Sequence, residues 1–150
     1  MSLHIHQEIL QRIHLHGEQA YPEEGAGLLL GELKGQDPQV GEILPLVNER
    51  EAGARHNRYQ LSPQDYLQGE EIAEKSGLTV LGVFHSHPDV PAEPSPIDTQ
   101  SAFPWFSYVI TSLQAGKTCE TRSWRLSHDR SRWSEEHIAR QTPGNSKEVA

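Results

Sequence analysis

The chain of 150 residues contains one cysteine, Cys119, so it can form neither an internal disulfide nor a zinc site built from several cysteines. It also lacks any run approaching the roughly 18 apolar residues that a membrane-spanning helix requires. Its first residues, MSLHIHQEIL, do not show the basic and then apolar pattern of a signal peptide. Together these absences favour a protein of the reducing cytoplasm.

Positive charge is scarce as well. Thirteen Lys and Arg residues stand against 21 Asp and Glu, which gives a formal net charge of −8 at pH 7. A nucleic-acid-binding protein needs a positive surface to attract phosphates, and an anionic membrane would repel this chain. We therefore expect neither nucleic acid nor membrane as a partner.

The length favours a single domain, because a chain of this size can bury a core without disulfides. We assign the domain to residues 1–140 and expect the polar residues 141–150 to form a disordered C-terminal tail. Apolar residues at helical spacing predict a helix from His6 to about Ala20, which Pro22 ends. The sequence carries no signal for the oligomeric state.

Several short apolar segments predict the strands of a sheet. The predicted strands are Gly27–Leu33, Val40–Val47, Thr79–Phe84, Ser107–Thr111 and Thr121–Leu126, and Trp133 could belong to a last short strand. The segment Thr79–Phe84 is apolar on both faces, as expected of a central strand. The polar residues 49–58 should form a loop.

Two further helices are predicted from their first residues. Ser62, Pro63 and Asp65 form a typical helix start, and Gly77 is the expected stop. A short helix should begin near Pro96. Helices and strands therefore interleave without a strict βαβ rhythm, which indicates an α/β or α+β fold with a mixed sheet.

The strongest functional signal lies in residues 85–98. His85 and His87 follow the predicted central strand, where side chains two residues apart point to the same face. Two imidazoles and the carboxylate of Asp98 are donors that Zn²⁺ prefers, and three protein ligands leave a position for water, as in catalytic zinc sites.

Each half of this pattern also has a simpler explanation. An H-x-H pair at a strand end is common by chance, and Ser95-Pro96-Ile97-Asp98 is a capping box at a helix start. The two explanations are compatible, because a helix start can also direct an aspartate at a metal. Their joint occurrence at a fixed spacing favours the metal site.

A catalytic zinc site also needs a proton carrier that does not bind the metal. Glu24 is the candidate, because it lies just before the strand Gly27–Leu33, whose entry would face the histidines if it paired with Thr79–Phe84. The neighbouring Glu23 is the alternative, and the choice of Glu24 rests on the Glu-x-x-Gly spacing.

The complete pattern resembles that of a known family. His85-x-His87-Pro88, seven further residues and Ser95-x-x-Asp98 are similar to the signature of the JAMM (MPN-plus) metallopeptidases at every fixed position. The segment Glu24-Gly25-Ala26-Gly27 resembles the family's upstream glutamate segment, although relatives often have cysteine in place of Ala26. The resemblance extends from about residue 3 to residue 133 and is closest to the short, stand-alone prokaryotic members.

This resemblance implies both a fold and an activity. The implied fold is a cytidine-deaminase-like α/β/α sandwich with a mixed sheet, and the implied activity is that of a Zn²⁺-dependent peptidase or isopeptidase. His85, His87 and Asp98 would be the zinc ligands, Glu24 the acid and base, and Ser95 a group that stabilises the oxyanion. The implied substrate is a conjugate of a small ubiquitin-like sulfur-carrier protein, cleaved after its C-terminal Gly-Gly.

Two other functions have to be weighed. A non-catalytic MPN-type scaffold of the same fold would lack some of the five site residues, whereas this chain has them all. A nucleobase deaminase needs H-x-E and P-C-x-x-C motifs, which a chain with a single cysteine cannot provide. The zinc hydrolase is therefore the main hypothesis, and the scaffold is the alternative.

Some further histidines and aromatic residues could mislead. We expect the histidines near the N-terminus to lie on a solvated surface rather than in a second metal site; they are His4, His6, His14 and His16. Trp105 and Phe106 are either core residues or part of a substrate groove. Trp124 and Trp133 are expected to be packing residues.

Overall fold

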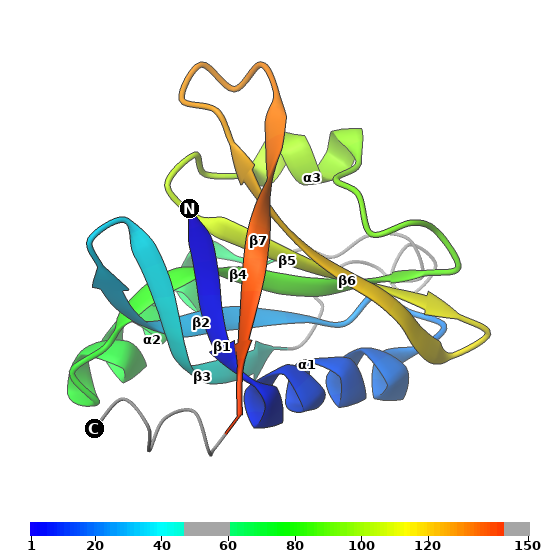
Figure 1. Ribbon diagram of the computed structural model, residues 1–150, viewed down its shortest axis with the longest axis horizontal. Coiled ribbons are helices and arrows are strands. Elements are labelled where there is room, and N and C mark those ends of the chain that lie inside the picture. The colour runs from blue at the N-terminus through cyan, green and yellow to red at the C-terminus, as the bar shows by residue number, and fades with distance from the viewer. Residues whose placement is uncertain (47–60, 143–150) are drawn as a thin grey trace.

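The structure, a computed structural model, describes residues 1–46 and 61–142. Along the chain these residues form β1 (Ser2–His6), α1 (Gln7–Ala20), β2 (Ala26–Lys34), β3 (Asp37–Leu46), α2 (Pro63–Lys75), β4 (Thr79–Pro88), α3 (Pro96–Ser101), β5 (Ser107–Gln114), β6 (Lys117–Leu126) and β7 (Trp133–Gln141) (Figure 1). The loop predicted for residues 49–58 lies outside the described residues, as do residues 143–150 of the tail predicted for 141–150; Gln141 is the last residue of β7. No helix in the described ranges is long and apolar enough to span a membrane.

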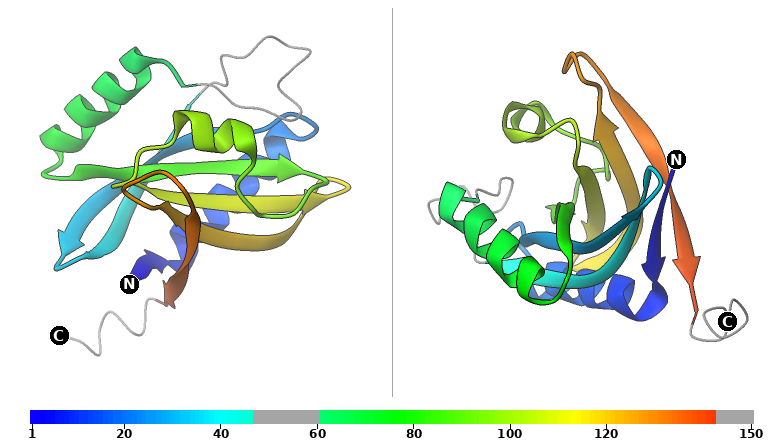
Figure 2. Two further views of the ribbon diagram at one scale, coloured as in Figure 1. Left: turned by 90° about the horizontal axis from the view of Figure 1, so that it is seen from above. Right: turned by 90° about the vertical axis from the view of Figure 1, so that its left-hand side faces the viewer.

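All seven strands of the described chain belong to one mixed sheet. It closes into a barrel in the order β1-β3-β2-β4-β5-β6-β7, with β2 antiparallel to β4 and β4 parallel to β5. The mixed sheet expected from the sequence is therefore present. The flat three-layer sandwich is not confirmed, because β1 pairs with both β3 and β7 and so joins the two ends of the sheet (Figure 2).

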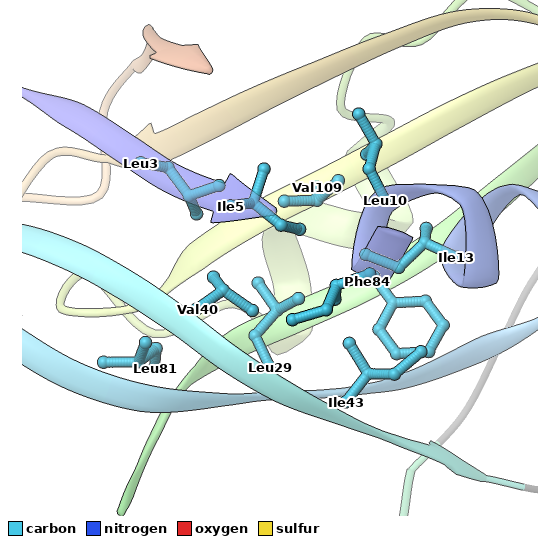
Figure 3. Packing of buried hydrophobic residues seen from close by; sticks show 11 residues of the cluster. Leu3, Ile5, Leu10, Ile13, Leu29, Val40, Ile43, Leu81, Phe84 and Val109 are labelled. Atoms are coloured by element: carbon cyan, nitrogen blue, oxygen red, sulfur yellow. The ribbon is translucent and has the colours of Figure 1, made fainter. Parts of the chain in front are cut away.

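Helices nevertheless pack on both faces of the sheet. Successive residues of β2 alternate between two cores: Leu29 packs with α1, whereas Leu28 and Leu30 pack with residues of α2 and the segment after α3. The first core gathers side chains from α1 and five strands (Figure 3). This alternation follows from the period of two along a strand, so β2 contributes side chains to both cores.

The helix α1 forms because its apolar residues recur at helical spacing. Ile9, Leu10, Ile13 and Gly17 are buried on one side of the helix, and α1 ends at Ala20 as the sequence predicts. The preceding strand β1 was not predicted. It is only five residues long and depends on its parallel pairing with β3 and β7.

The central strand is longer than predicted. β4 continues beyond Phe84 to Pro88, and every residue from Leu81 to His87 is buried. Both histidines therefore lie inside the strand and not in the loop that follows it. On one side β4 pairs with β2 as far as Ala26↔His85, and on the other side it pairs with β5 along its last seven residues.

The second helix begins and ends as expected. Ser62 and Asp65 form a capping box at the start of α2, with Pro63 in the first turn. Gly77 follows the C-terminal end with a φ of +71°, a backbone conformation that glycine adopts without steric cost. Both signals are local, which is why the sequence was sufficient to predict them.

Candidate metal centre

Three side chains from β4 and α3 converge at the end of the central strand. The Nε2 atoms of His85 and His87 lie 3.2 Å apart. The Asp98 carboxylate places Oδ1 3.3 Å from Nε2 of His85 and Oδ2 3.2 Å from Nε2 of His87. All three side chains are buried, and a ligand atom from each lies within 4.8 Å of the others. These residues could therefore hold a metal ion.

The Ser95–Asp98 segment caps a helix and also faces the two histidines. The Ser95 hydroxyl accepts a hydrogen bond from the Asp98 N–H at 3.1 Å, and Asp98 Oδ2 accepts one from the Ser95 N–H at 2.8 Å. This capping box starts α3 and also fixes the Asp98 carboxylate in front of the two imidazoles. Ser95 itself is half-buried.

The orientation of His87 is set by its second ring nitrogen. Nδ1 lies 2.8 Å from the main-chain carbonyl oxygen of Pro91, which can only accept a hydrogen bond. Nδ1 therefore carries a proton, and Nε2 is the nitrogen that faces Asp98 and His85. A metal ion would bind to this Nε2 in place of its proton.

The proline-rich loop that follows β4 is fixed by side chains of three strands. Three successive carbonyl oxygens accept hydrogen bonds: Val90 from the Ser112 hydroxyl at 2.6 Å, Pro91 from His87, and Ala92 from the Trp124 indole N–H at 2.9 Å. The sequence suggested only packing for Trp124 and nothing for Ser112. Neither contact leaves a sequence signal, because each joins residues more than 20 positions apart.

The connection between β6 and β7 holds the other end of α3. Arg130 donates hydrogen bonds to the carbonyls of Thr99 at 2.7 Å and Ala102 at 2.6 Å. The Trp133 indole donates to the Thr99 hydroxyl at 2.9 Å, and this hydroxyl in turn donates to the Ser95 carbonyl at 3.1 Å. The short helix that presents Asp98 is thus anchored at both ends.

Burial and charge set the protonation of the three side chains. Burial alone would raise the pKa of Asp98, but the two imidazoles and the Ser95 N–H hold it well below its ordinary value. Burial lowers the pKa of His85. For His87, burial acts in the same direction, but the hydrogen bond and charge of Asp98 outweigh it and raise the pKa. The site therefore contains a carboxylate that stays ionised in an enclosed environment.

Glu24 lies close to this cluster. The pairing of β2 with β4, on which its selection depended, is present, with Ala26 opposite His85. Glu24 is only 4% exposed, and burial raises its pKa to about 8, while the charge of His87 opposes this shift and that of Asp98 adds to it. Glu23 is half-buried by comparison. Burial thus distinguishes two neighbours that the sequence could separate only by spacing.

The histidines near the N-terminus are less solvated than expected. Each of the four is half-buried. His14 Nε2 lies 2.8 Å from the Thr121 hydroxyl, and the ring of His16 packs edge-on against Phe84. Within residues 1–46 and 61–142, no group of metal-ligating side chains includes them. Their contacts are structural.

An apolar groove lies beside α3. It has a volume of about 840 Å³ and runs between α2, the start of β4 and the segment after α3. Trp105 and Phe106 both line it, and Trp105 is 63% exposed and stacks on Phe103 with ring centres 5.1 Å apart. Of the two roles weighed for Trp105, the groove is therefore the one that the structure supports.

Fold and site together define an α/β protein with a candidate metal centre on the central strand of a mixed sheet. The chain matches the family described as prokaryotic homologs of the JAB domain over residues 6–127, and it belongs to this family. The resemblance to the JAMM/MPN group seen in the sequence is thus confirmed.

Two relatives with an assigned activity are about a third identical to this chain over the segments that align. The probable TtuB-protein conjugate cleaving protease of Thermus thermophilus is 32% identical over 110 residues, which cover 73% of this chain and 70% of the relative. The desampylase of Pyrococcus furiosus is 32% identical over 69 residues, which cover 46% of this chain and 47% of the relative. A probable conjugate-cleaving protease and a desampylase are therefore among its homologues.

Solved structures support the fold. The solution structure of a protein from Desulfitobacterium hafniense superposes with a TM-score of 0.81 at 32% identity and covers 93% of each chain. A JAB1/MPN domain protein from Archaeoglobus fulgidus gives a TM-score of 0.55 at 16% identity, covering 93% of this chain and 99% of its own. The second likeness concerns the fold alone.

Proposed function

We propose that this chain is a cytoplasmic, zinc-dependent peptidase or isopeptidase that acts on a conjugate of a small ubiquitin-like sulfur-carrier protein. The bond hydrolysed is the one after the carrier's C-terminal Gly-Gly. The observation that carries this proposal is the convergence of His85, His87 and Asp98 beside the buried Glu24. The substrate class is supported by the Thermus and Pyrococcus relatives, whose names describe cleavage of protein conjugates.

The spacing of the three side chains fits zinc. Zinc bonds to histidine nitrogen and carboxylate oxygen are about 2.0–2.2 Å long, so two ligands of a tetrahedral ion lie about 3.3–3.6 Å apart. The contacts among His85, His87 and Asp98 are 3.2 and 3.3 Å. Two neutral imidazoles and one carboxylate are also a donor set found in catalytic zinc sites, which keep a further position open.

In this proposal the three ligands hold the ion and other side chains handle protons. A bound zinc ion supplies Lewis-acid chemistry, because it polarises a carbonyl oxygen and makes water acidic near neutral pH. Glu24 takes a proton from the attacking water and passes it to the leaving amine. Burial raises its pKa in the metal-free site, and the charge of a bound zinc ion would lower that pKa again, so Glu24 would be ionised and able to accept a proton.

Ser95 is the proposed donor to the oxyanion. Its oxygen already accepts a hydrogen bond from the Asp98 N–H, so its own hydroxyl proton is available to a substrate. The Thr99 hydroxyl holds the Ser95 carbonyl, which limits the movement of this residue. A donor of this kind contributes roughly 3 kcal/mol to the transition state in other hydrolases.

The proposal is tested by metal analysis combined with a cleavage assay. The purified protein should contain about one zinc ion per chain and should cleave a carrier joined through its C-terminal Gly-Gly to a lysine side chain. A chelator should abolish cleavage, and added zinc should restore it. A conjugate whose terminal glycines are replaced by alanines is the matched control and should resist cleavage. Hydrolysis that a chelator leaves unchanged would contradict the metal mechanism, and a protein without zinc or activity would support the scaffold instead.

A further inference from the structure

The residue between the two histidines occupies a special position. Ser86 is 2% exposed, and its side chain points to the opposite face of β4 from His85 and His87, because side chains alternate along a strand. On that face it meets α1: a Cβ atom placed on Gly17 would lie 3.0 Å from the Ser86 Cβ. Ser86 therefore cannot contact a metal ion held by the histidines, and its hydroxyl has a different partner.

That partner is the peptide unit next to Glu24. The Gly25 N–H donates a hydrogen bond to the Ser86 Oγ at 2.8 Å, and the Ser86 N–H donates one to the Gly25 carbonyl at 3.0 Å. The first bond holds the Glu24–Gly25 peptide plane, and the second holds the Gly25–Ala26 plane. A single residue of β4 thus fixes both planes that flank Gly25.

The surroundings leave Gly25 little freedom. A Cβ atom at this position would lie 3.0 Å from Cδ2 of His16 and 3.1 Å from the Cβ of Ala20, so α1 presses on Gly25 from the other side. The backbone lies in a narrow slot between the helix and β4. The carboxyl group of Glu24 is buried and interacts electrostatically with His87 and Asp98.

We infer that Ser86 is a positioning residue whose hydroxyl holds the Glu24–Gly25 peptide and thereby directs the Glu24 carboxyl group at the ion site. The inference rests on the proposed role of Glu24. One strand then sets the distance between ligands and proton carrier, with the imidazoles on one face of β4 and the hydroxyl on the other. A carboxyl group displaced by a fraction of an ångström transfers protons less well, although substrate and metal still bind.

The test compares Ser86→Ala with Ser86→Thr, which retains the oxygen. In metal-free protein, hydrogen exchange measured by NMR should accelerate about tenfold or more at the Gly25 amide in Ser86→Ala. In the zinc-loaded protein, kcat for the carrier–lysine conjugate should fall about tenfold or more, while KM and the zinc dissociation constant stay within about threefold. Ser86→Thr should restore both the exchange rate and kcat.

A second serine controls for loss of a buried hydrogen bond. Ser123 is also buried, on β6, which β5 separates from β4, and its hydroxyl donates to Glu136 at 2.9 Å. Ser123→Ala should lower thermal stability by a similar amount and leave kcat unchanged. Two results would overturn the inference if Glu24→Gln is inactive. In the first, Ser86→Ala keeps kcat within about twofold of the original value; in the second, Ser86→Ala loses activity only in proportion to the zinc that it has lost. A fully active Glu24→Gln would instead contradict the proposed function itself. The two proposals can therefore fail separately and be told apart.

Discussion

The imidazole of His87 donates a hydrogen bond from Nδ1 to the carbonyl of Pro91 at 2.8 Å, so the loop after the central strand determines which nitrogen faces the metal site. The same loop is held one residue further on by the Trp124 indole, which donates to the Ala92 carbonyl at 2.9 Å. A partner of this kind orients a metal ligand without touching the metal.

Replacement of Trp124 by phenylalanine should therefore weaken zinc binding. The variant keeps an aromatic ring but loses the N–H that holds the loop, so Pro91 is less well placed to orient His87. We expect the zinc dissociation constant, measured by competition with a chromophoric chelator, to rise by about tenfold. Trp105→Phe makes the same change at an exposed tryptophan that has no contact with this loop among the described hydrogen bonds, and a similar rise in that control would contradict the explanation.

Replacement of Glu24 by glutamine should stop catalysis while sparing the metal. Glutamine has nearly the same shape but cannot carry the proton, so kcat should fall by about 10²-fold or more. Zinc content should be unchanged, since Glu24 is not among the three proposed ligands. Glu23→Gln is the matched control. An active Glu24→Gln beside an inactive Glu23→Gln would show that the wrong glutamate has been chosen.

Replacement of Asp98 by asparagine should separate its two roles. Asparagine retains an oxygen that can accept from the Ser95 N–H, so α3 should still be capped. The negative charge is lost, and zinc affinity should fall by about 10²-fold while the melting temperature of the metal-free protein changes little. Asp65→Asn removes the equivalent charge from the capping box of α2 and should leave zinc affinity unchanged. Unchanged zinc binding in Asp98→Asn would leave Asp98 as a helix cap only.

Replacement of Trp105 by alanine should affect recognition of a protein substrate and not the chemistry. Trp105 is 63% exposed in the apolar groove beside α3, and large aromatic side chains dominate the energetics of protein interfaces. KM for an intact carrier conjugate should rise about fivefold or more, with kcat nearly unchanged. Leu15→Ala, at an exposed apolar residue of α1 away from the groove, should change neither value. Equal KM values for the Trp105 and Leu15 variants would exclude a role of the groove in binding.

Much of the architecture could be predicted because its signals are local. The capping residues of α2 and α3, the apolar face of α1 and the hydrophobic character of β4 depend on a few neighbouring positions, and the structure contains each of them. The strand β1 was missed for the opposite reason. Five residues do not define a strand by themselves, and its place is decided by β3 and β7, which lie far away in the chain.

The sequence by itself determined which side chains could form a metal site. His85, His87 and Asp98 lie in one segment, in which the two-residue spacing of the histidines indicates one face of a strand and Ser95-Pro96-Ile97-Asp98 indicates a helix start. Only the tertiary structure decided what surrounds them. The approach of Glu24, the bond from Ser86 to Gly25 and the contacts that fix the loop after β4 all join residues tens of positions apart. Contacts of this kind depend on the order of the strands in the sheet and on the side chains that pack against it. Neither can be predicted from the spacing of residues that are close together in the sequence.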